Sequence, residues 1–315
     1  MRATIPKTIH YCWFGEGPKN ELIQRCIASW REWLPDYGIV EWNESNFDPA
    51  SHPFAAEMYH RKKWAFLADY VRMWVLYHQG GVYLDVDVEL FGPLDRFLEH
   101  SAFSGVERMN THLSAFNPQC FGAVSGHPWI EECLAYYDSV DLTNSSLLFL
   151  TNTSIVSKLL IDRWGALAKD RYQVLHSSQD PGRGADIVLY PSWVLCLPNY
   201  WVRPSALHHF AGSWLPPKDS SAKGSPLSRL PLPRQPWLSD WQVSAGASGH
   251  PLAYYYTPPL LYPLLDSTCA LYLWPRQLLR RAVRALKLRL KLDPDKALLG
   301  QLTDRSSGRD APDQS

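Results

Sequence analysis

Two aspartates separated by one residue, Asp85 and Asp87, are the strongest candidates for chemistry in this sequence. They lie in an apolar run that extends from Val82 to Leu90 and also contains Glu89. Three acids along an apolar strand repel one another and resist burial unless a cation or solvent compensates them. Hard divalent cations take oxygen ligands and share them with substrate phosphates. The run therefore predicts a metal–diphosphate site.

The spacing of the two aspartates is a weak signal by itself, because Asp293 and Asp295 repeat it near the end of the chain. The surrounding run strengthens it. In a strand from Val82 to Leu90 the side chains alternate between two faces, and the aliphatic ones share one face. The other face then carries Tyr83, Asp85, Asp87 and Glu89.

A second pair of charged residues precedes this run on a predicted helix from Trp64 to Gln79, which Gly80 and Gly81 end. Asp69 and Arg72 are three residues apart, so they lie on one side of the helix and can reach a common ligand. The planar guanidinium suits phosphate oxygens or sugar hydroxyls. A solvent-exposed ion pair is the alternative, but apolar residues on both sides of the pair argue against simple exposure.

The elements around these residues alternate between strand and helix. We expect strands at Thr8–Phe14, Ile39–Trp42 and Asp186–Tyr190, and helices at Asn20–Trp33 and Ile155–Trp164. A strand, helix, strand order at the N-terminus predicts an α/β protein with parallel strands.

Several segments together resemble a known family. Phe66–Arg72 followed by Gly80–Asp87 is similar to the signature of the DXD-containing sugar transferases of glycosyltransferase family 32, and the large glucosylating bacterial toxins carry a related block. Three further segments are similar to this family and occur in the same order: Ile5–Trp13, Glu41–Asn43 and Leu207–Trp214. The resemblance covers roughly residues 4–215.

The resemblance implies a GT-A type, Rossmann-like nucleotide-sugar-binding domain with a mixed sheet, followed by a helical or irregular C-terminal extension. It implies a hexosyltransferase that uses Mn²⁺ or Mg²⁺ and takes the sugar from a nucleotide-diphosphate donor. Of the two possible donors, we expect a UDP-sugar before a GDP-sugar. The implied acceptor is a glycan or a lipid-linked glycan, as in capsule or surface polysaccharide synthesis. The expected reaction retains the anomeric configuration.

The resemblance also implies a role for each residue at the expected site. Asp87 is a direct metal ligand, and Asp85 contacts the ribose of the donor and the metal region. Asp69 and Arg72 bind the transferred sugar and the diphosphate, with Tyr83 nearby. All five fall within the matching signature.

Residues outside the signature receive roles in the same way. His209, at an H-x-x-G spacing from Gly212, is a further metal ligand, and the adjacent His208 can exchange roles with it. Ser213 and Trp214 close over the diphosphate.

Trp13 stacks on the nucleobase in the same interpretation, which suits an aromatic residue after a strand. A core position is the alternative for one of 14 tryptophans.

No residue stands out as a general base or nucleophile. In a reaction that retains configuration, the acceptor hydroxyl can attack from the face of the leaving group and give its proton to a donor phosphate oxygen.

Beyond the expected catalytic domain, residues 1–217, the composition changes twice. Residues 218–259 are rich in Pro, Ser and Gly and are typical of a linker or irregular extension. Residues 260–292 include a basic amphipathic segment that suits either an anionic membrane surface or packing on the catalytic domain. Residues 293–315 are polar and are expected to be a disordered tail.

The overall composition narrows the class of protein. Lys and Arg total 31, as do Asp and Glu, which argues against a nucleic-acid-binding protein. Without a signal peptide or an apolar stretch of about 18 residues, we expect a cytoplasmic location, with attachment to the inner face of the membrane through the basic segment as an option. The six cysteines have no metal-binding spacing and are expected to be reduced and packed. A nucleotide-sugar hydrolase and an inactive membrane-associated scaffold are the alternative functions.

Overall fold

The structure is a computed structural model, and it describes residues 4–109, 112–143, 151–176, 185–199 and 202–211. All of them belong to one compact unit. The three segments expected after the catalytic domain lie outside the described residues, namely 218–259, 260–292 and 293–315.

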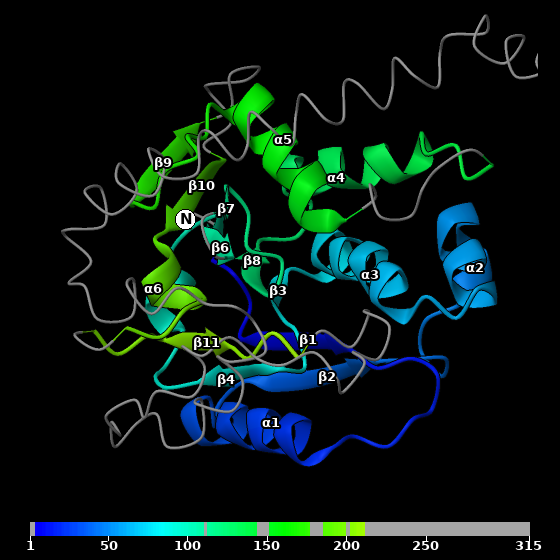
Figure 1. Ribbon diagram of the computed structural model, residues 1–315, viewed down its shortest axis with the longest axis horizontal. Helices are drawn as coiled ribbons and strands as arrows, with labels where there is room; N and C mark the ends of the chain where they lie inside the picture. Colours follow the sequence, from blue (N-terminus) through cyan, green and yellow to red (C-terminus); the bar gives the residue numbers. More distant parts are fainter. Residues whose placement is uncertain (1–3, 110–111, 144–150, 177–184, 200–201, 212–315) are drawn as a thin grey trace, which may run out of the picture. The chain divides into compact units, whose positions relative to one another are not determined.

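Strands and helices alternate along the described chain (Figure 1). The strands are β1 Thr8–Cys12, β2 Gly38–Trp42, β3 Gly81–Leu84, β4 Val88–Leu90, β5 Ala102–Gly105, β6 Glu107–Met109, β7 His112–Ser114, β8 Cys120–Ala123, β9 Gln173–His176, β10 Asp186–Tyr190 and β11 Ala206–His208. The α-helices are α1 Glu21–Trp33, α2 Pro53–His60, α3 Trp64–Gln79, α4 Pro128–Asp138, α5 Asn152–Trp164 and α6 Ser192–Leu195. Two 3₁₀ turns are η1 Pro49–Ser51 and η2 Asp95–Phe97.

Seven strands form one mixed sheet in the order β2-β1-β3-β8-β5-β10-β9. Strand β1 is parallel to both β2 and β3, as the order of elements at the N-terminus predicts. Strand β8 is antiparallel to β3 and to β5, and β9 is antiparallel to β10. The expected α/β class with a mixed sheet is therefore confirmed.

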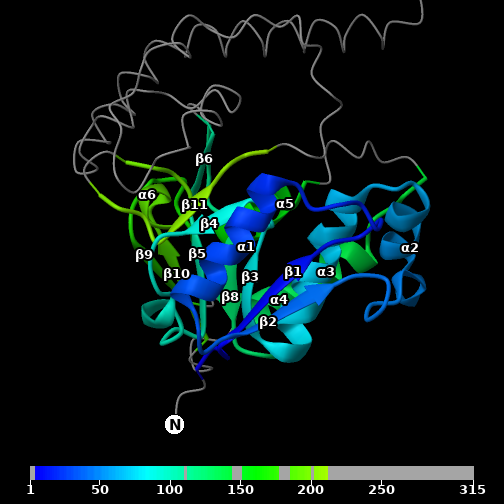
Figure 2. The same cartoon turned by 90° about the horizontal axis from the view of Figure 1, so that it is seen from below.

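Helices cover both faces of this sheet, which gives three layers (Figures 1 and 2). On one face, Ile23, Ile27 and Trp30 of α1 pack with Val82 and Leu84 of β3. On the other face, helices α2 to α5 supply a second core that includes many aromatic side chains. Because helices shield both faces, the central strands are buried throughout.

Local signals in the sequence explain where the site-bearing elements begin and end. The side chain of Asn20 caps α1 by accepting a hydrogen bond from the backbone of Ile23 at 3.0 Å. Helix α3 has the predicted bounds and ends at Gly80, whose φ of 66° favours glycine. Gly81 follows at φ 109°, and a Cβ there would lie 2.7 Å from the carbonyl oxygen of Thr8. These two glycines let the chain pass from α3 directly into β3.

The single strand predicted from Val82 to Leu90 is wrong. Strand β3 ends at Leu84, and the backbone of Val88 closes a turn by donating to the carbonyl of Asp85 at 3.0 Å. Strand β4 then leaves the main sheet and pairs with β11 in a separate two-stranded sheet. The predicted polar face is also absent at Tyr83, which is buried with its aliphatic neighbours, because β3 lies in the centre of a sheet covered on both sides.

Two further expectations can be compared with the described residues. The five cysteines there are free and buried, in agreement with packed thiols. Among the same residues, no helix combines the length and apolar character needed to cross a membrane.

Candidate metal centre

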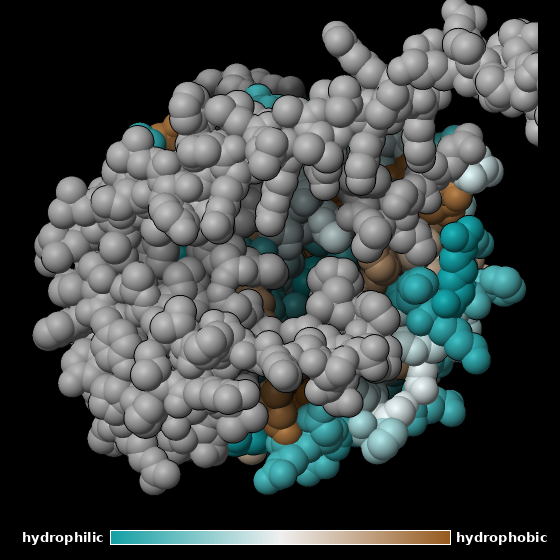
Figure 3. Space-filling model, viewed as in Figure 1, coloured by the Kyte–Doolittle hydropathy of each residue, from teal (hydrophilic) through white to brown (hydrophobic). Residues whose placement is uncertain are grey.

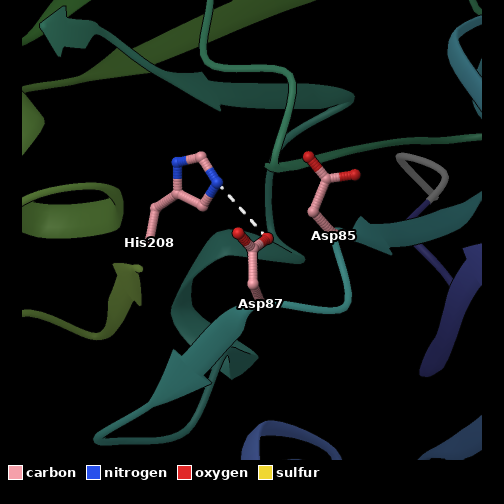
Figure 4. Close-up of side chains that lie close together, drawn as sticks. All are labelled: Asp85, Asp87 and His208. Atoms are coloured by element: carbon pink, nitrogen blue, oxygen red, sulfur yellow. Dashed lines mark ion pairs between the residues drawn. The ribbon is translucent and has the colours of Figure 1, made fainter. Parts of the chain in front are cut away.

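The turn between β3 and β4 brings the two aspartates of the motif together with a histidine from β11. Ligand atoms of Asp85, Asp87 and His208 all lie within 4.8 Å of one another. Their side chains converge on a common space (Figure 4). The turn makes this possible, because an extended strand would carry the residues after Leu84 away along the main sheet. Two carboxylates and an imidazole form a set of ligands that suits a divalent cation.

Asp87 is held by contacts along the 206–211 segment. Its Oδ1 lies 3.3 Å from His208 Nε2, and its Oδ2 accepts a hydrogen bond from the backbone of Ala211 at 2.9 Å. Burial alone would raise the pKa of Asp87, but His208 and the Ala211 amide outweigh it and lower the pKa to about 2. The pKa of His208 is raised, because Asp87 and other nearby carboxylates outweigh the effect of burial. The chain therefore favours an ionised Asp87.

His209, the histidine expected to bind the metal, lies differently from His208. Its Nε2 is 2.7 Å from Glu89 Oε2, and its backbone amide donates to the carbonyl of Asp87 at 3.0 Å. The two histidines are adjacent in an extended segment, so their side chains diverge, and His208 is the one that faces the aspartates. The structure thus replaces His209 with His208 in the group, which is the exchange that their adjacency allows.

Asp85 is bound from the other side by the α3 pair. Arg72 Nη2 lies 3.0 Å from Asp69 Oδ1 and 3.3 Å from Asp85 Oδ1. Arg72 also donates to the carbonyl of Pro118 at 2.7 Å, and its guanidinium lies 4.6 Å from the centre of the Tyr83 ring. The predicted helix pair is therefore buried and joined to the motif, which excludes a simple surface ion pair.

The electrostatics around Asp69 and Asp85 differ from those around Asp87. Burial raises the pKa of Asp69 to about 7, although Arg72 opposes the change. The pKa of Asp85 is also raised, by burial and by the neighbouring Asp87, against the pull of Arg72. Two carboxylates and one guanidinium share a partly enclosed space. A ligand that brings further cations or hydrogen-bond donors would relieve this imbalance.

Trp13 lies at the same edge of the sheet as Asp85. It directly follows β1, which runs parallel to β3 with His10 level with Tyr83. The indole is half-buried, donates from Nε1 to the carbonyl of Gly17 at 2.7 Å, and has the Lys19 ammonium 5.1 Å from its ring centre. It is therefore not a fully enclosed core residue, and part of it remains open to contact.

Two of the expected binding residues, Ser213 and Trp214, lie outside the described residues. The other expected residues fall into the two halves of one cluster, around Asp87 and around Arg72, with Trp13 at the adjoining strand end. In the view of Figure 1, the described surface that is visible near the centre includes hydrophilic residues (Figure 3).

Sequence reasoning missed a third carboxylate beside this cluster. Glu107, the first residue of β6, is buried, and this burial raises its pKa to about 7. His208, Asp85 and Arg72 each influence its acidity, so it lies within electrostatic reach of both halves of the centre. The segment around Glu107 has no motif or clear periodicity, and only the folded chain places it there.

The comparisons with known proteins agree with this geometry. Residues 20–104 match the family described as "Glycosyltransferase sugar-binding region containing DXD motif". This range contains Asp69, Arg72, Asp85 and Asp87. The resemblance to the DXD-containing sugar transferases is confirmed over that range.

Two curated fungal proteins are similar to part of the chain. One is inositol phosphoceramide mannosyltransferase 3 of Schizosaccharomyces pombe, 31% identical over 135 residues, which are 41% of this chain and 36% of the relative. The other is mannosyl phosphorylinositol ceramide synthase SUR1 of Saccharomyces cerevisiae, 30% identical over 137 residues, which are 41% of this chain and 34% of the relative. The chain thus spans about a third of the length of these relatives.

Solved structures resemble the fold more distantly. The PaToxG glycosyltransferase aligns with a TM-score of 0.39 and 17% identity over 50% of this chain and 69% of its own. A glycosyltransferase involved in glycosylation of the major capsid of PBCV-1 aligns with a TM-score of 0.35 and 10% identity over 64% of this chain and 93% of its own.

Proposed function

We propose that this protein transfers a hexose, or a derivative of one, from a nucleotide-diphosphate sugar to a hydroxyl group of a glycan or lipid-linked glycan. One observation carries the proposal. Asp85, Asp87 and His208 meet at a turn that Arg72 and Asp69 reach from α3, and four of these five residues fall within the matching family segment.

The ligand set fits Mn²⁺ or Mg²⁺, because both ions accept carboxylate oxygens and Mn²⁺ also accepts imidazole nitrogen. Asp85, Asp87 and His208 are the residues that would hold the ion. Its chemical contribution there would be to offset the negative charge that builds on the departing diphosphate.

The chain's own groups position the donor. Arg72 is a fixed guanidinium that can bind a phosphate oxygen or sugar hydroxyls, and Asp69 lies beside it to accept hydrogen bonds from those hydroxyls. Asp85 connects Arg72 and Asp69, together called the Arg72 arm, to the ion site and can contact the ribose. Trp13 at the end of β1 offers its ring face to the base. The proposed base is uracil, with guanine as the alternative.

For the transfer itself we propose retention of the anomeric configuration. The acceptor hydroxyl attacks the anomeric carbon from the face that the diphosphate leaves, and its proton passes to a diphosphate oxygen. The bond from the anomeric carbon to the diphosphate breaks, and the electron pair stays with the phosphate. The anomeric configuration of the isolated product tests this step, and an inverted product contradicts it.

The acceptor is proposed to be presented at the cytoplasmic face of a membrane. Two observations support this setting. The named fungal relatives act on inositol phosphoceramide, which is a lipid with a polyol headgroup. The basic segment within residues 260–292 suits an anionic surface. A capsule or surface-glycan intermediate would satisfy the same requirement. If protein truncated after residue 259 still sediments with phosphatidylserine vesicles, the role of the basic segment is excluded.

The first experiment is a thermal-shift screen of UDP-sugars and GDP-sugars with and without Mn²⁺, run on wild-type protein and on Asp87→Ala. We expect one donor to stabilise the wild type only when Mn²⁺ is present and to leave the variant unshifted. Glu32→Ala, at an exposed carboxylate of α1, is the control and should behave like the wild type. A donor shift of equal size in Asp87→Ala would contradict the proposed site. Release of free sugar instead of transfer in any acceptor mixture would identify a hydrolase.

A further inference from the structure

The carboxylate of Glu107 lies near His208, a positive group that opposes the effect of burial on its pKa. Its side chain is 8% exposed, and among the described residues no lysine or arginine forms an ion pair with it. Its hydrogen-bond partner is the side chain of Thr153. Within the described residues a single hydroxyl reaches this carboxylate, which leaves acceptor capacity unused because two oxygens offer about four lone-pair positions. Glu107 therefore needs further donors, which a ligand can supply.

The backbone around Glu107 is firmly held, so the carboxylate has a fixed position. Strand β6 pairs with β7 in a register that places Glu107 opposite Ser114. The next residue, Arg108, is 2% exposed and forms a 2.9 Å ion pair with the equally buried Asp170. Before it, the backbone of Val106 donates to the carbonyl of Tyr190 at 2.8 Å. A carboxylate on such a rigid support is preorganised for recognition.

The first turn of α5 lies between Glu107 and the Arg72 arm. Thr153 contacts Glu107, while the neighbouring Asn152 donates from Nδ2 to the backbone carbonyl of Asp69 at 2.9 Å and to Tyr137 Oη at 3.2 Å. Asn152 is 2% exposed, and its Oδ1 has no hydrogen-bond partner among the described residues. An orphaned buried acceptor is costly, and a ligand with a donor group would satisfy it.

We propose that Glu107, Asn152 and Thr153 form a binding site for hydroxyl groups of the sugar acceptor, beside the metal centre. This inference rests on the proposed transfer function. The carboxylate and the amide oxygen both accept hydrogen bonds, and a threonine hydroxyl can donate or accept. Together they match a polyol, whose hydroxyl groups can donate to both oxygens and pair with the threonine hydroxyl.

The position of the site favours the acceptor over the donor sugar. Arg72 already offers the donor a cation for its phosphates. Glu107 lies on a different element, β6, and is influenced by His208 and by Thr153 of α5. Thr153 is partly exposed, so this side is reachable from solvent.

The test is saturation-transfer NMR with methyl α-D-mannopyranoside and myo-inositol as probes, in the presence of Mn²⁺ and UDP or GDP. Wild-type protein is expected to transfer saturation to at least one probe. Glu107→Gln keeps the shape but removes the charge, and should raise the Kd of that probe about tenfold. Thr153→Val should raise it less, about threefold. Glu99→Gln, at an exposed carboxylate, is the matched control and should change nothing.

Three results would overturn the proposal: no saturation transfer in the wild type, an unchanged Kd in both variants, or a higher Kd for the nucleotide sugar in Glu107→Gln. The last would place Glu107 at the donor. If Glu107→Gln does not fold, Thr153→Val decides alone. The thermal shift by nucleotide and Mn²⁺ is recorded on the same samples. Its absence in the wild type counts against the transfer function, whereas its presence without an effect on the polyols counts against this site only.

Discussion

Two buried arginines, Arg72 and Arg108, have similar surroundings but different partners. Arg108 pairs with Asp170 at 2.9 Å, with side chains 2% and 1% exposed. Both oxygens of Asp170 receive additional hydrogen bonds from Ser192, at 2.7 Å from its amide and 2.6 Å from its hydroxyl. Both charges of this pair are thus compensated by described residues, and both side chains are almost fully buried.

The pairs of Arg72 are compensated only in part. Asp69 and Asp85 share its guanidinium, and their side chains remain 14% and 26% exposed. Among the described residues, these carboxylates therefore keep acceptor capacity on their exposed sides. The comparison teaches that burial of a charged pair is not by itself a sign of function. The distinguishing feature is whether the chain completes the hydrogen bonding or leaves part of it to a ligand.

The largest expected effect comes from breaking the completed pair. Asp170→Ala leaves the Arg108 guanidinium buried without a counter-ion, and should lower the free energy of unfolding by about 3–5 kcal/mol. Urea unfolding followed by circular dichroism measures the loss. Asp162→Ala removes a carboxylate from an exposed pair with Lys158 and should change stability little. Similar losses in both variants would show that the Arg108 pair has no special structural role.

The next effect separates function from stability at the other arginine. Arg72→Lys keeps the charge but cannot contact Asp69, Asp85 and the Pro118 carbonyl together, so kcat/KM for transfer should fall about hundredfold or more. The unfolding free energy should fall less than in Asp170→Ala, because the carboxylates remain near solvent and can take up protons. Initial rates and urea unfolding on one preparation measure both quantities. A stability loss equal to that of Asp170→Ala would remove the distinction between the two arginines.

A smaller effect is expected at Trp13, the residue proposed to bind the nucleobase. Trp13→Ala removes a half-buried ring, and should raise the Kd of the donor about tenfold, as loss of one stacking contact does. Isothermal titration calorimetry with donor and Mn²⁺ measures the change. Trp33→Ala is the control, because that ring contacts Arg203 at 5.0 Å instead of the strand end. Equal donor affinity in wild type and Trp13→Ala would assign the ring to packing alone.

The smallest effect concerns two buried neutral histidines that lie in the core, away from the metal centre. Burial lowers the pKa of His10 and of His127 to about 4. In the unfolded chain these histidines have a pKa near 6.5 and bind protons that they do not bind in the folded chain. Their contribution to stability is therefore fully present above pH 6.5 and is lost as the pH falls towards 4. Each histidine should remove about 0.7 kcal/mol between pH 7 and pH 6.

Urea titrations at both pH values measure this loss. His127→Asn keeps a side-chain acceptor at the start of α4, where His127 Nδ1 accepts from the Trp129 amide at 3.2 Å, and should reduce the pH dependence. An unchanged dependence would place the proton uptake elsewhere. Because this loss arises in the core, nucleotide binding at the Arg72 arm should follow a separate pH profile.

Much of the framework follows from the sequence alone. Periodicity and glycine punctuation predict the bounds of α3 and β10, and the strand, helix, strand order predicts parallel pairing. The spacing of Asp69 and Arg72, and that of Asp85 and Asp87, identify the residues that the fold then joins. These features are local, so a local reading of the chain can find them.

The missed features depend on contacts between distant segments. Val82–Leu90 has the alternation of one strand, but pairing of β4 with β11 takes its second half into another sheet. The choice between His208 and His209 is set by that same pairing, which fixes which side chain faces Asp87. Glu107 carries no sequence signal, since its position depends on β7, α5 and the Arg108 pair. Long-range pairing, not local propensity, decides each case.

The pairing of β4 with β11 also has a consequence for biosynthesis. The contact between Glu89 and His209 closes a loop of 120 residues, and His208 enters the carboxylate group through the same two-stranded sheet. During translation from the N-terminus, the ribosome must release nearly the whole described chain before the group is complete. A nascent chain that already contains the Asp85–Asp87 turn would thus lack the complete group until β11 emerges, so the proposed activity can begin only after folding has reached β11.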